Sequence, residues 1–313
     1  MKGALCFPPS FGAYFDRPPA VGRVFFVQAF TGDNGNKGTA DEPFATITYA
    51  LSQCSDDRND YIIVLDAWQE AMPIAINKTR VHIIGLGTTP NHPYVMLNAS
   101  ADTAIFTVTA ASNNCEIAGF SFGGGATHAA IENVGGTPMG LYIHDCVFGH
   151  SFAGNTPQDG IRVGLNATNI RVEDCLFLGN EAEGGGTLTR DGIRFAGAGD
   201  PLGGAFKGNT FLGIPGVGLN IVSVAANSGG FIIENNKFFA EIADAKAAGW
   251  AITLQGAAIV KGCFVCGNVA SQTGDVTGNN PYRDLSTGVI GTCLNGWTNN
   301  HAGEALSTGP AVV

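Results

Sequence analysis

The segments Tyr142-Ile143-His144-Asp145-Cys146-Val147-Phe148 and Arg171-Val172-Glu173-Asp174-Cys175-Leu176-Phe177 are two copies of one short pattern. Each copy alternates apolar and polar residues, which is the period of a strand with one buried face. A polar residue then interrupts the strand, and a phenylalanine follows three positions later. The two copies are 29 residues apart. That interval suits two or three short strands and is too short for a propeller blade of ~40–45 residues.

The same pattern recurs along most of the chain. The small or polar position is occupied in turn by Gly85, Gly119, Asp145, Asp174, Gly208, Asn235 and Gly262. From the second copy onward, the position three residues later is occupied by Phe122, Phe148, Phe177, Phe211, Phe238 and Val265. A second set of short alternating segments lies between the copies, at 104–108, 130–134, 160–163, 192–195, 218–221 and 251–254.

Seven repeats of this kind predict a solenoid in which each coil stacks on the next at ~4.8 Å. The interior columns are then the phenylalanines and a mixed set, Cys146, Cys175, Asn209, Asn236 and Cys263. The Gly/Asp/Asn position is typical of a turn, because these residues tolerate unusual backbone angles. The predicted fold is all-β, a right-handed parallel β-helix.

The ends of such a stack need caps. In residues 41–54, Phe44, Ile47, Leu51 and Cys54 share one helical face, behind acidic residues and Pro43 at the N-terminal end. We therefore predict an extended N-terminal arm at 1–28, a first strand and capping helix at 29–60, the β-helix at 61–268, and an irregular C-terminal cap or tail at 269–313. The arm has four prolines, and its expected anchors are Phe7, Phe11, Tyr14, Phe15, Phe25 and Phe26.

Composition narrows the function classes. Apolar residues make up 45% of the 313, enough for a large core, and the net charge of −10 disfavours nucleic acid and membrane surfaces as partners. No apolar run reaches the ~18 residues of a membrane span, and the N-terminus lacks the pattern of a signal peptide. Cys263-Phe264-Val265-Cys266 has no second ligand pair, and the histidines have no metal spacing, so neither cofactor nor metal is predicted. The sequence does not decide whether Cys266 and Cys293 form a disulfide.

A resemblance adds to this interpretation. Residues 32–47, Gly-Asp-Asn-Gly-Asn-Lys-Gly-Thr-Ala-Asp-Glu-Pro-Phe-Ala-Thr-Ile, resemble the opening motif of pectate-lyase-like β-helix proteins. Residues 59–65 and 81–87 are similar to β-helix repeat proteins of tailed-phage virions, and the resemblance covers roughly 24–270. It implies a homotrimer on the outer surface of a virion, made in the host cytoplasm without a signal peptide.

Two functions follow as hypotheses. The first is a non-catalytic capsid decoration or cement protein, whose arm binds the major capsid protein lattice or neighbouring subunits. The second is a small tailspike or β-helix enzyme that degrades a host surface glycan. A glycan-binding module without turnover is a third.

The best catalytic candidates lie in a repeated tetrapeptide. Asp159-Gly160-Ile161-Arg162 and Asp191-Gly192-Ile193-Arg194 should stack, with Glu132 one coil earlier at the arginine position. Stacked carboxylates are spaced as glycosidases require. The alternative, which we favour, is a salt-bridged surface column without catalysis. The motifs of polygalacturonases are absent from matching positions.

Overall fold

The protein is described by a computed structural model. It describes residues 22–67, 70–87, 94–99, 101–123, 125–150, 157–164, 166–180, 186–195, 201–223, 229–239, 250–256, 260, 262–270, 282–286 and 295–302. The expected anchors Phe7, Phe11, Tyr14 and Phe15 lie outside these residues, as does Cys293.

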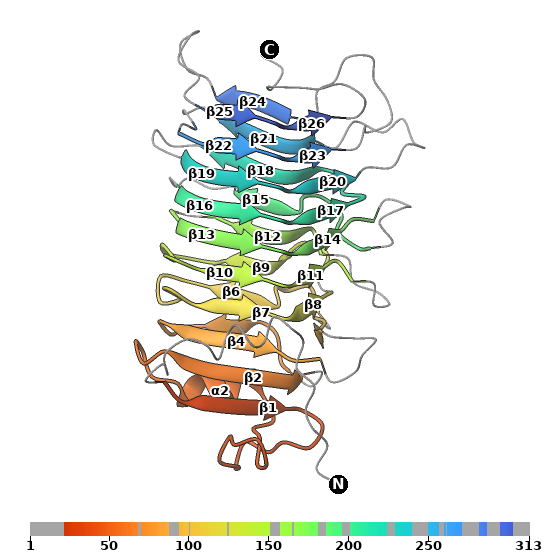
Figure 1. Cartoon of the computed structure of the whole chain (residues 1–313). Helices are drawn as coiled ribbons and strands as arrows, with labels where there is room; N and C mark the ends of the chain where they lie inside the picture. Colours follow the sequence, from red (N-terminus) through yellow and green to blue (C-terminus); the bar gives the residue numbers. More distant parts are fainter. Residues whose placement is uncertain are drawn as a thin grey trace.

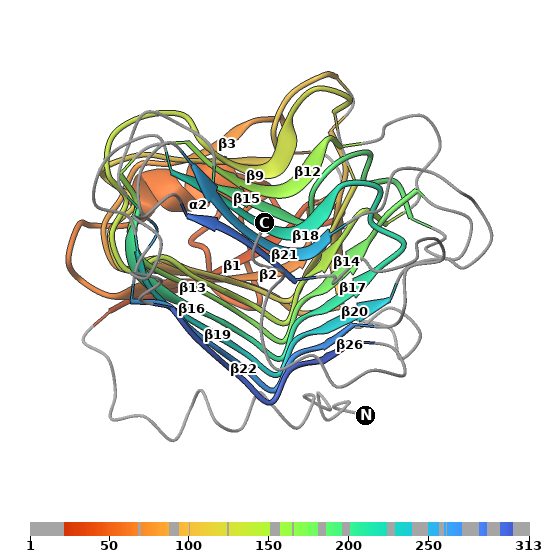
Figure 2. The ribbon, with the colours of Figure 1, turned by 90° about the horizontal axis from the view of Figure 1, so that it is seen from above.

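Three parallel sheets run the length of the molecule (Figures 1 and 2). Sheet 1 has ten described strands: β1 (Val24–Gln28), β2 (Asp60–Asp66), β4 (Val81–Gly85), β7 (Glu116–Ala118), β10 (Tyr142–His144), β13 (Thr168–Glu173), β16 (Leu202–Lys207), β19 (Gly229–Glu234), β22 (Phe264–Cys266) and β25 (Gly296–Thr298). Sheet 2 has eight: β5 (Val95–Leu97), β8 (Phe120–Phe122), β11 (Val147–Phe148), β14 (Leu176–Leu178), β17 (Thr210–Leu212), β20 (Lys237–Phe239), β23 (Val269–Ala270) and β26 (His301–Ala302).

Sheet 3 also has eight described strands: β3 (Ile74–Ile76), β6 (Phe106–Val108), β9 (Ala129–Asn133), β12 (Asp159–Val163), β15 (Ile193–Phe195), β18 (Val217–Ser223), β21 (Trp250–Gly256) and β24 (Tyr282–Ser286). From β7 to β24 the chain passes from sheet 1 to sheet 2 to sheet 3, and each coil pairs in parallel with the next. The predicted parallel β-helix is confirmed, and the second set of alternating segments forms sheet 3.

A sharp corner joins sheet 1 to sheet 2, as Figure 2 shows from above. Its first residue has a positive φ in every coil from the fourth onward, at Gly119, Asp145, Asp174, Gly208, Asn235, Gly267 and Asn299. This conformation favours glycine, asparagine and aspartate, so the turn interpretation of the repeated position is confirmed.

The predicted register fails in one coil. Cys266 pairs with Glu234, which makes Gly267 and not Gly262 the partner of Asn235. The residue at the phenylalanine position is accordingly Ala270, opposite Phe238, and not Val265. Gly262 is followed by Cys263 and Gly267 by Asn268, and both cysteine and asparagine occur in the interior column of other coils. The sequence pattern therefore could not distinguish the two glycines, and the prediction chose Gly262.

Aromatic stacking fills the interior at sheet 2. Successive ring centroids of Phe122, Phe148, Phe177, Phe211 and Phe238 are 4.9, 4.7, 4.6 and 4.7 Å apart. These spacings match the distance between neighbouring strands, so one ring per coil makes a continuous stack.

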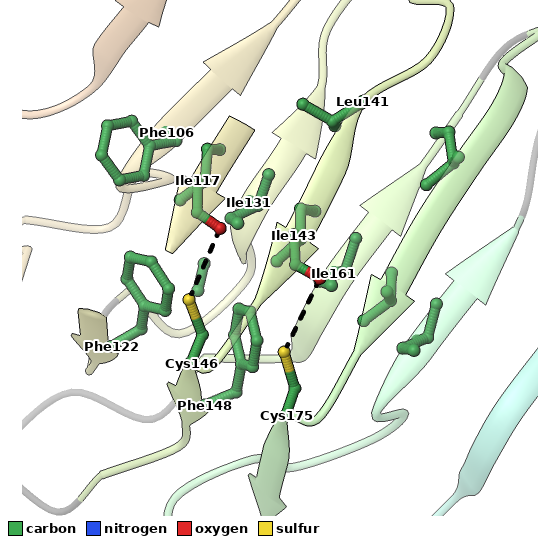
Figure 3. Close-up of a cluster of buried hydrophobic side chains, with 14 of the residues drawn as sticks. Phe106, Ile117, Phe122, Ile131, Leu141, Ile143, Cys146, Phe148, Ile161 and Cys175 are labelled. Atoms are coloured by element: carbon green, nitrogen blue, oxygen red, sulfur yellow. Dashed lines mark hydrogen bonds between the residues drawn. The ribbon is translucent and has the colours of Figure 1, made fainter. Parts of the chain in front are cut away.

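A second interior column is polar. It begins with the buried thiols of Cys146 and Cys175, which contact the carbonyl oxygens of Ile117 and Ile143 (Figure 3). It continues as a ladder of buried asparagine side chains, Asn209, Asn236, Asn268 and Asn300, each bonded to the next. Each amide therefore satisfies its neighbour inside the core, where unpaired polar groups are costly.

The short helix α2 (Ile47–Gln53) covers the first coil and buries Ile47, Ala50 and Leu51. The predicted apolar face is confirmed, because Phe44, Ile47, Leu51 and Cys54 are all buried. The expected acidic N-terminus is wrong, since the first turn holds no acidic residue. Instead, the distant Glu70 carboxylate accepts hydrogen bonds from the N–H groups of Ile47 and Thr48 at 2.6 and 3.2 Å.

Both predicted ends of the solenoid need correction. Residues 24–28, expected in the arm, form β1, which pairs in parallel with β2, with a register shift between Val27 and Gln28. Phe25 is a core residue, and its ring centroid lies 5.7 Å from that of Phe44. Phe26 packs against a small apolar cluster of sheet 1 that includes Ile63 and Ile84. At the other end, β23 to β26 extend the three sheets past residue 269, where irregular structure was expected.

Candidate functional site on the outer face of sheet 3

The outward column of sheet 3 contains the charged residues that the sequence singled out. Arg162 pairs with Glu132 in β9 and with Arg194 in β15, and Arg194 pairs with Asn220 in β18. The expected stacking of the two tetrapeptides, with Glu132 one coil earlier, is therefore present. Interior residues such as Ile161 and Ile193 alternate with the column and fix its outward direction.

Asp159 lies beneath this column and is fully buried. Its carboxylate accepts hydrogen bonds from Arg162 Nε and Arg190 Nε, both at 2.8 Å, from Arg190 Nη2, and from the Asp191 backbone N–H at 3.2 Å. Burial alone would lower the pKa of Arg190, but the hydrogen bond to Asp159 and its negative charge outweigh burial and raise it. Arg190 therefore remains a cation that compensates the buried carboxylate.

Asp191 is buried in the same way, with 2% of its surface exposed. It accepts from Arg194 Nη1 and Asn220 Nδ2, each at 3.0 Å, and from the Val217 N–H at 2.8 Å. Both aspartates hold neighbouring coils together. As candidate catalytic residues they need correction, because neither carboxylate is accessible to a polysaccharide in this conformation.

The accessible group of the site is a residue that the sequence prediction missed. His128 has 41% of its side chain exposed, and its Nδ1 lies 2.8 Å from Glu132 Oε2. The other carboxylate oxygen of Glu132 accepts from Arg162 Nη1 at 3.1 Å. Asp159, Arg162 and Glu132 thus form a connected series that ends at the imidazole. The sequence signal, a histidine four residues before the stacked glutamate, was too common to single it out.

This geometry suits proton transfer. A carboxylate that accepts from Nδ1–H fixes the tautomer, and in the neutral ring Nε2 then carries the lone pair of a base. Arg190 lies shortly before β15 and Arg194 lies in it, and their side chains are 31% and 28% exposed. The site therefore combines an accessible base with cations that can bind an anionic group. Among the described residues, no group of three or more His, Cys, Asp or Glu side chains is placed to hold a metal ion.

A second polar cluster lies on the outer face of sheet 1. Glu116 accepts from His82 Nδ1 at 2.5 Å and from His144 Nε2 at 2.8 Å, and His144 Nδ1 contacts Asp145 at 2.8 Å. His82 Nε2 is 2.7 Å from Asn59 Oδ1. Both nitrogens of each ring are engaged, so this cluster links coils and offers no ring nitrogen for catalysis.

Comparison with known proteins agrees with the fold. No protein-family model matches the sequence, and no curated protein matches it. Similar solved structures include a rhamnogalacturonan lyase, with TM-score 0.51 and 16% identity over 80% of this chain and 68% of that chain. The pectate lyase Pel9A matches with TM-score 0.52 and 14% identity over 89% of this chain and 68% of that one.

A GH136 lacto-N-biosidase from Eubacterium ramulus matches with TM-score 0.60 and 11% identity, over 90% of this chain and 56% of its own length. At these identities the likeness establishes the shared β-helix fold alone. The tailed-phage origin expected from the sequence stays a prediction. No helix in the described ranges is long and apolar enough to span a membrane.

Proposed function

We propose that the protein binds an acidic polysaccharide along sheet 3 and cleaves it by β-elimination, with His128 as the base. The observation that carries the proposal is the exposed His128 ring, which Glu132 holds through Nδ1. His128 takes the proton from the carbon next to the uronate carboxylate, a C=C bond forms, and the C–O bond to the neighbouring sugar breaks. The leaving oxygen takes a proton from solvent, so the step balances.

The burial of the aspartates favours elimination over hydrolysis. Glycoside hydrolysis needs two carboxyl groups that reach the scissile bond, and Asp159 and Asp191 are buried and paired with arginines. Elimination needs a base and cations that stabilise the charge developing on the uronate. Arg162, the cation nearest in register, is bound to Glu132 and Asp159, and Arg190 and Arg194 follow one coil later. Two of the similar folds belong to proteins named as polysaccharide lyases, which supports the same reaction class.

The test is an absorbance assay for unsaturated uronate ends on polygalacturonate, rhamnogalacturonan and alginate. We expect product from at least one polymer, and a loss of at least ~100-fold with His128→Gln, the usual scale for removing a general base. The matched control is Lys207→Gln, a half-exposed residue on sheet 1 that pairs with Glu234, and it should keep full activity. Binding without product, or equal activity of His128→Gln, would overturn the lyase proposal.

A second candidate keeps the structural role that the sequence favours, a non-catalytic homotrimeric component of a phage particle. The observation in its favour is a pair of apolar side chains on the outer face of sheet 1. Ile232 and Phe264 pair in neighbouring strands and are 40% and 47% exposed. Exposed adjacent apolar residues are typical of contact surfaces.

Sedimentation equilibrium tests this candidate. A trimer that Ile232→Ser and Phe264→Ser together convert to a monomer would support it, as would hundreds of copies per purified particle by quantitative mass spectrometry. A monomer at all concentrations would contradict it.

A further inference from the structure

The outer face of sheet 1 carries four polar side chains that join three consecutive strands, β4, β7 and β10 (Figure 1). They are His82 of β4, Glu116 of β7, His144 of β10 and Asp145 at the corner that follows, and we call them the histidine cluster. The Glu116 carboxylate lies between the two rings, with Oε2 2.5 Å from His82 Nδ1 and Oε1 2.8 Å from His144 Nε2. His144 Nδ1 lies 2.8 Å from Asp145 Oδ2. Both nitrogens of His144 therefore face carboxylate oxygens.

The three contacts between rings and carboxylates need more protons than neutral rings supply. An ionised carboxylate only accepts, so each contact needs one N–H, and a neutral imidazole carries a single N–H. Two neutral rings then leave one contact in which a ring lone pair faces a carboxylate oxygen, which is repulsive. His82 needs no second proton, since the amide of Asn59 beside its Nε2 either accepts or donates according to its orientation. The missing proton therefore belongs on His144.

The carboxylates of the cluster have no fixed cation. In the part of the chain that the structure describes, neither Glu116 nor Asp145 forms an ion pair with a lysine or arginine, and their ion-pair partners are the two imidazoles. Arg171 of the next strand, β13, is bound to Glu173 at 2.8 Å. The contrast is Asp159 of sheet 3, a buried carboxylate that two guanidinium groups hold. A buried carboxylate needs such compensation, and at Glu116 an imidazolium supplies it.

The other titratable and charged groups around the cluster do not oppose a positive charge there. Burial, and after it the charges of Asp145 and Glu173, raises the pKa of Asp174, so negative charge is crowded beside His144. The Tyr142 hydroxyl donates to Glu173 at 3.0 Å. The remaining groups are Tyr61 of β2, which stacks on His82, Tyr94 before β5, Arg58, which is paired with Asp60, Lys207 of β16, which is paired with Glu234, and the inward thiols of Cys146 and Cys175.

We propose that His144 holds a proton between Glu116 and Asp145, and that this proton fastens β4, β7 and β10 together as a pH-dependent switch. The imidazolium donates from both nitrogens, and Glu116 then accepts from both rings. This goes beyond the proposed function, because it concerns sheet 1 and holds whether or not sheet 3 cleaves a glycan.

Rising pH should weaken the cluster. When these strands separate, the rings are in water, where histidine loses its proton near pH 6.5. Above that pH the closed cluster binds one proton more than the opened one, so each pH unit raises the equilibrium constant for opening by up to tenfold, until the closed cluster releases the proton. Below about pH 6.5 both states are protonated, and the stabilisation is present in full.

Nuclear magnetic resonance of the ring nitrogens tests the proton itself. An imidazolium has two protonated nitrogens, whereas a neutral ring has one protonated and one bare nitrogen, and the two forms differ in their ¹⁵N shifts. At pH 8 a histidine in water is neutral, and we expect His144, assigned through its own backbone, to have two protonated nitrogens. A neutral His144 ring at this pH would overturn the proposal.

Hydrogen exchange over β7 and β10 tests the effect on opening. Divided by the intrinsic exchange rate at each pH, the measured rate gives the opening equilibrium, which we expect to rise at least tenfold from pH 6.5 to pH 8.5. Glu116→Gln should abolish this rise, because its amide accepts from one ring and donates to the other, so neutral rings satisfy all three contacts.

The matched control is Glu234→Gln, the same substitution in β19 of the same sheet, at a residue that pairs with Lys207. It should keep the rise of the unmodified protein. A rise in Glu116→Gln equal to that of the unmodified protein, or no rise in the unmodified protein, would contradict the proposal.

Discussion

Asn236→Ala should lower the free energy of unfolding strongly, because the Asn236 side chain is bonded to both of its neighbours in the asparagine ladder. The Asn236 side chain accepts at Oδ1 from the backbone N–H and from Nδ2 of Asn209, both at 3.0 Å. Its Nδ2 donates to the Phe206 carbonyl and to Asn268 Oδ1, both at 2.9 Å. The whole side chain is 1% exposed, so no solvent replaces these bonds. Four buried hydrogen bonds at about 1 kcal/mol each predict a loss of about 4 kcal/mol.

The neighbouring Asn235 is the matched control. It is exposed, has a φ of 57°, and occupies the turn position. Asn235→Gly should change stability by less than ~0.5 kcal/mol, because glycine adopts this conformation freely.

Urea unfolding followed by circular dichroism gives the free energies. Hydrogen exchange over β16 to β20 shows whether the loss is local, because solenoids can open coil by coil. A loss below about 1 kcal/mol for Asn236→Ala, or equal losses at both asparagines, would refute the argument that the ladder carries this stability.

Three further predictions concern other parts of the solenoid. Phe177→Ala removes a ring stacked on both neighbours at 4.7 and 4.6 Å, so urea unfolding should show a loss of about 3–5 kcal/mol; a loss below ~1 kcal/mol would contradict the role of the stack. Burial alone would raise the pKa of Asp60, but the Arg58 guanidinium and two backbone N–H groups lower it below 3.8. Because the folded pKa is then below the unfolded one, this stabilisation is present above about pH 4 and is lost as the pH falls further, so Asp60→Asn should flatten the acid limb of a stability–pH curve. Cys266 is half-buried, while the other five described cysteine thiols are buried. Iodoacetamide should therefore modify Cys266 first among these six, as measured by peptide mapping. Earlier modification of Cys175 would contradict the burial of its thiol in the core.

The sequence predicted the fold well because each coil repeats the same physical requirements. The period-2 alternation located the strands, and the positive-φ corner required Gly, Asp or Asn in coil after coil. The predicted register was wrong where Gly262-Cys263 and Gly267-Asn268 both satisfied the pattern. The correct choice was hidden because the position that holds phenylalanine in the preceding coils holds the small Ala270 here. It also placed the first strand within 29–60 and not at 24–28, because the proline-rich composition of 1–21 led to an arm that was drawn over a strand of only five residues.

The candidate site was predictable only in part. Strand alternation gave the outward column of Glu132, Arg162 and Arg194 correctly. The burial of Asp159 depends on Arg190, which comes from the segment before the next strand of sheet 3 and binds it through space. The orientation of His128 depends on one carboxylate shared with Arg162. Contacts of this kind join different coils, so no local pattern encodes them.

The corner between sheets 1 and 2 has a consequence for how such a chain tolerates change in length. In the six coils from β10 to β26, two residues separate the strand of sheet 1 from that of sheet 2. The spacing between successive corners nevertheless varies, with Asp145, Asp174, Gly208 and Asn235 separated by 29, 34 and 27 residues. The variation in coil length therefore lies outside this corner, in the lengths of the strands and at the corners from sheet 2 to sheet 3 and from sheet 3 to sheet 1. A foreign peptide inserted at one of those two corners would leave the phenylalanine stack in register, whereas one residue added after Asp174 would turn every following side chain of β14 to the opposite face.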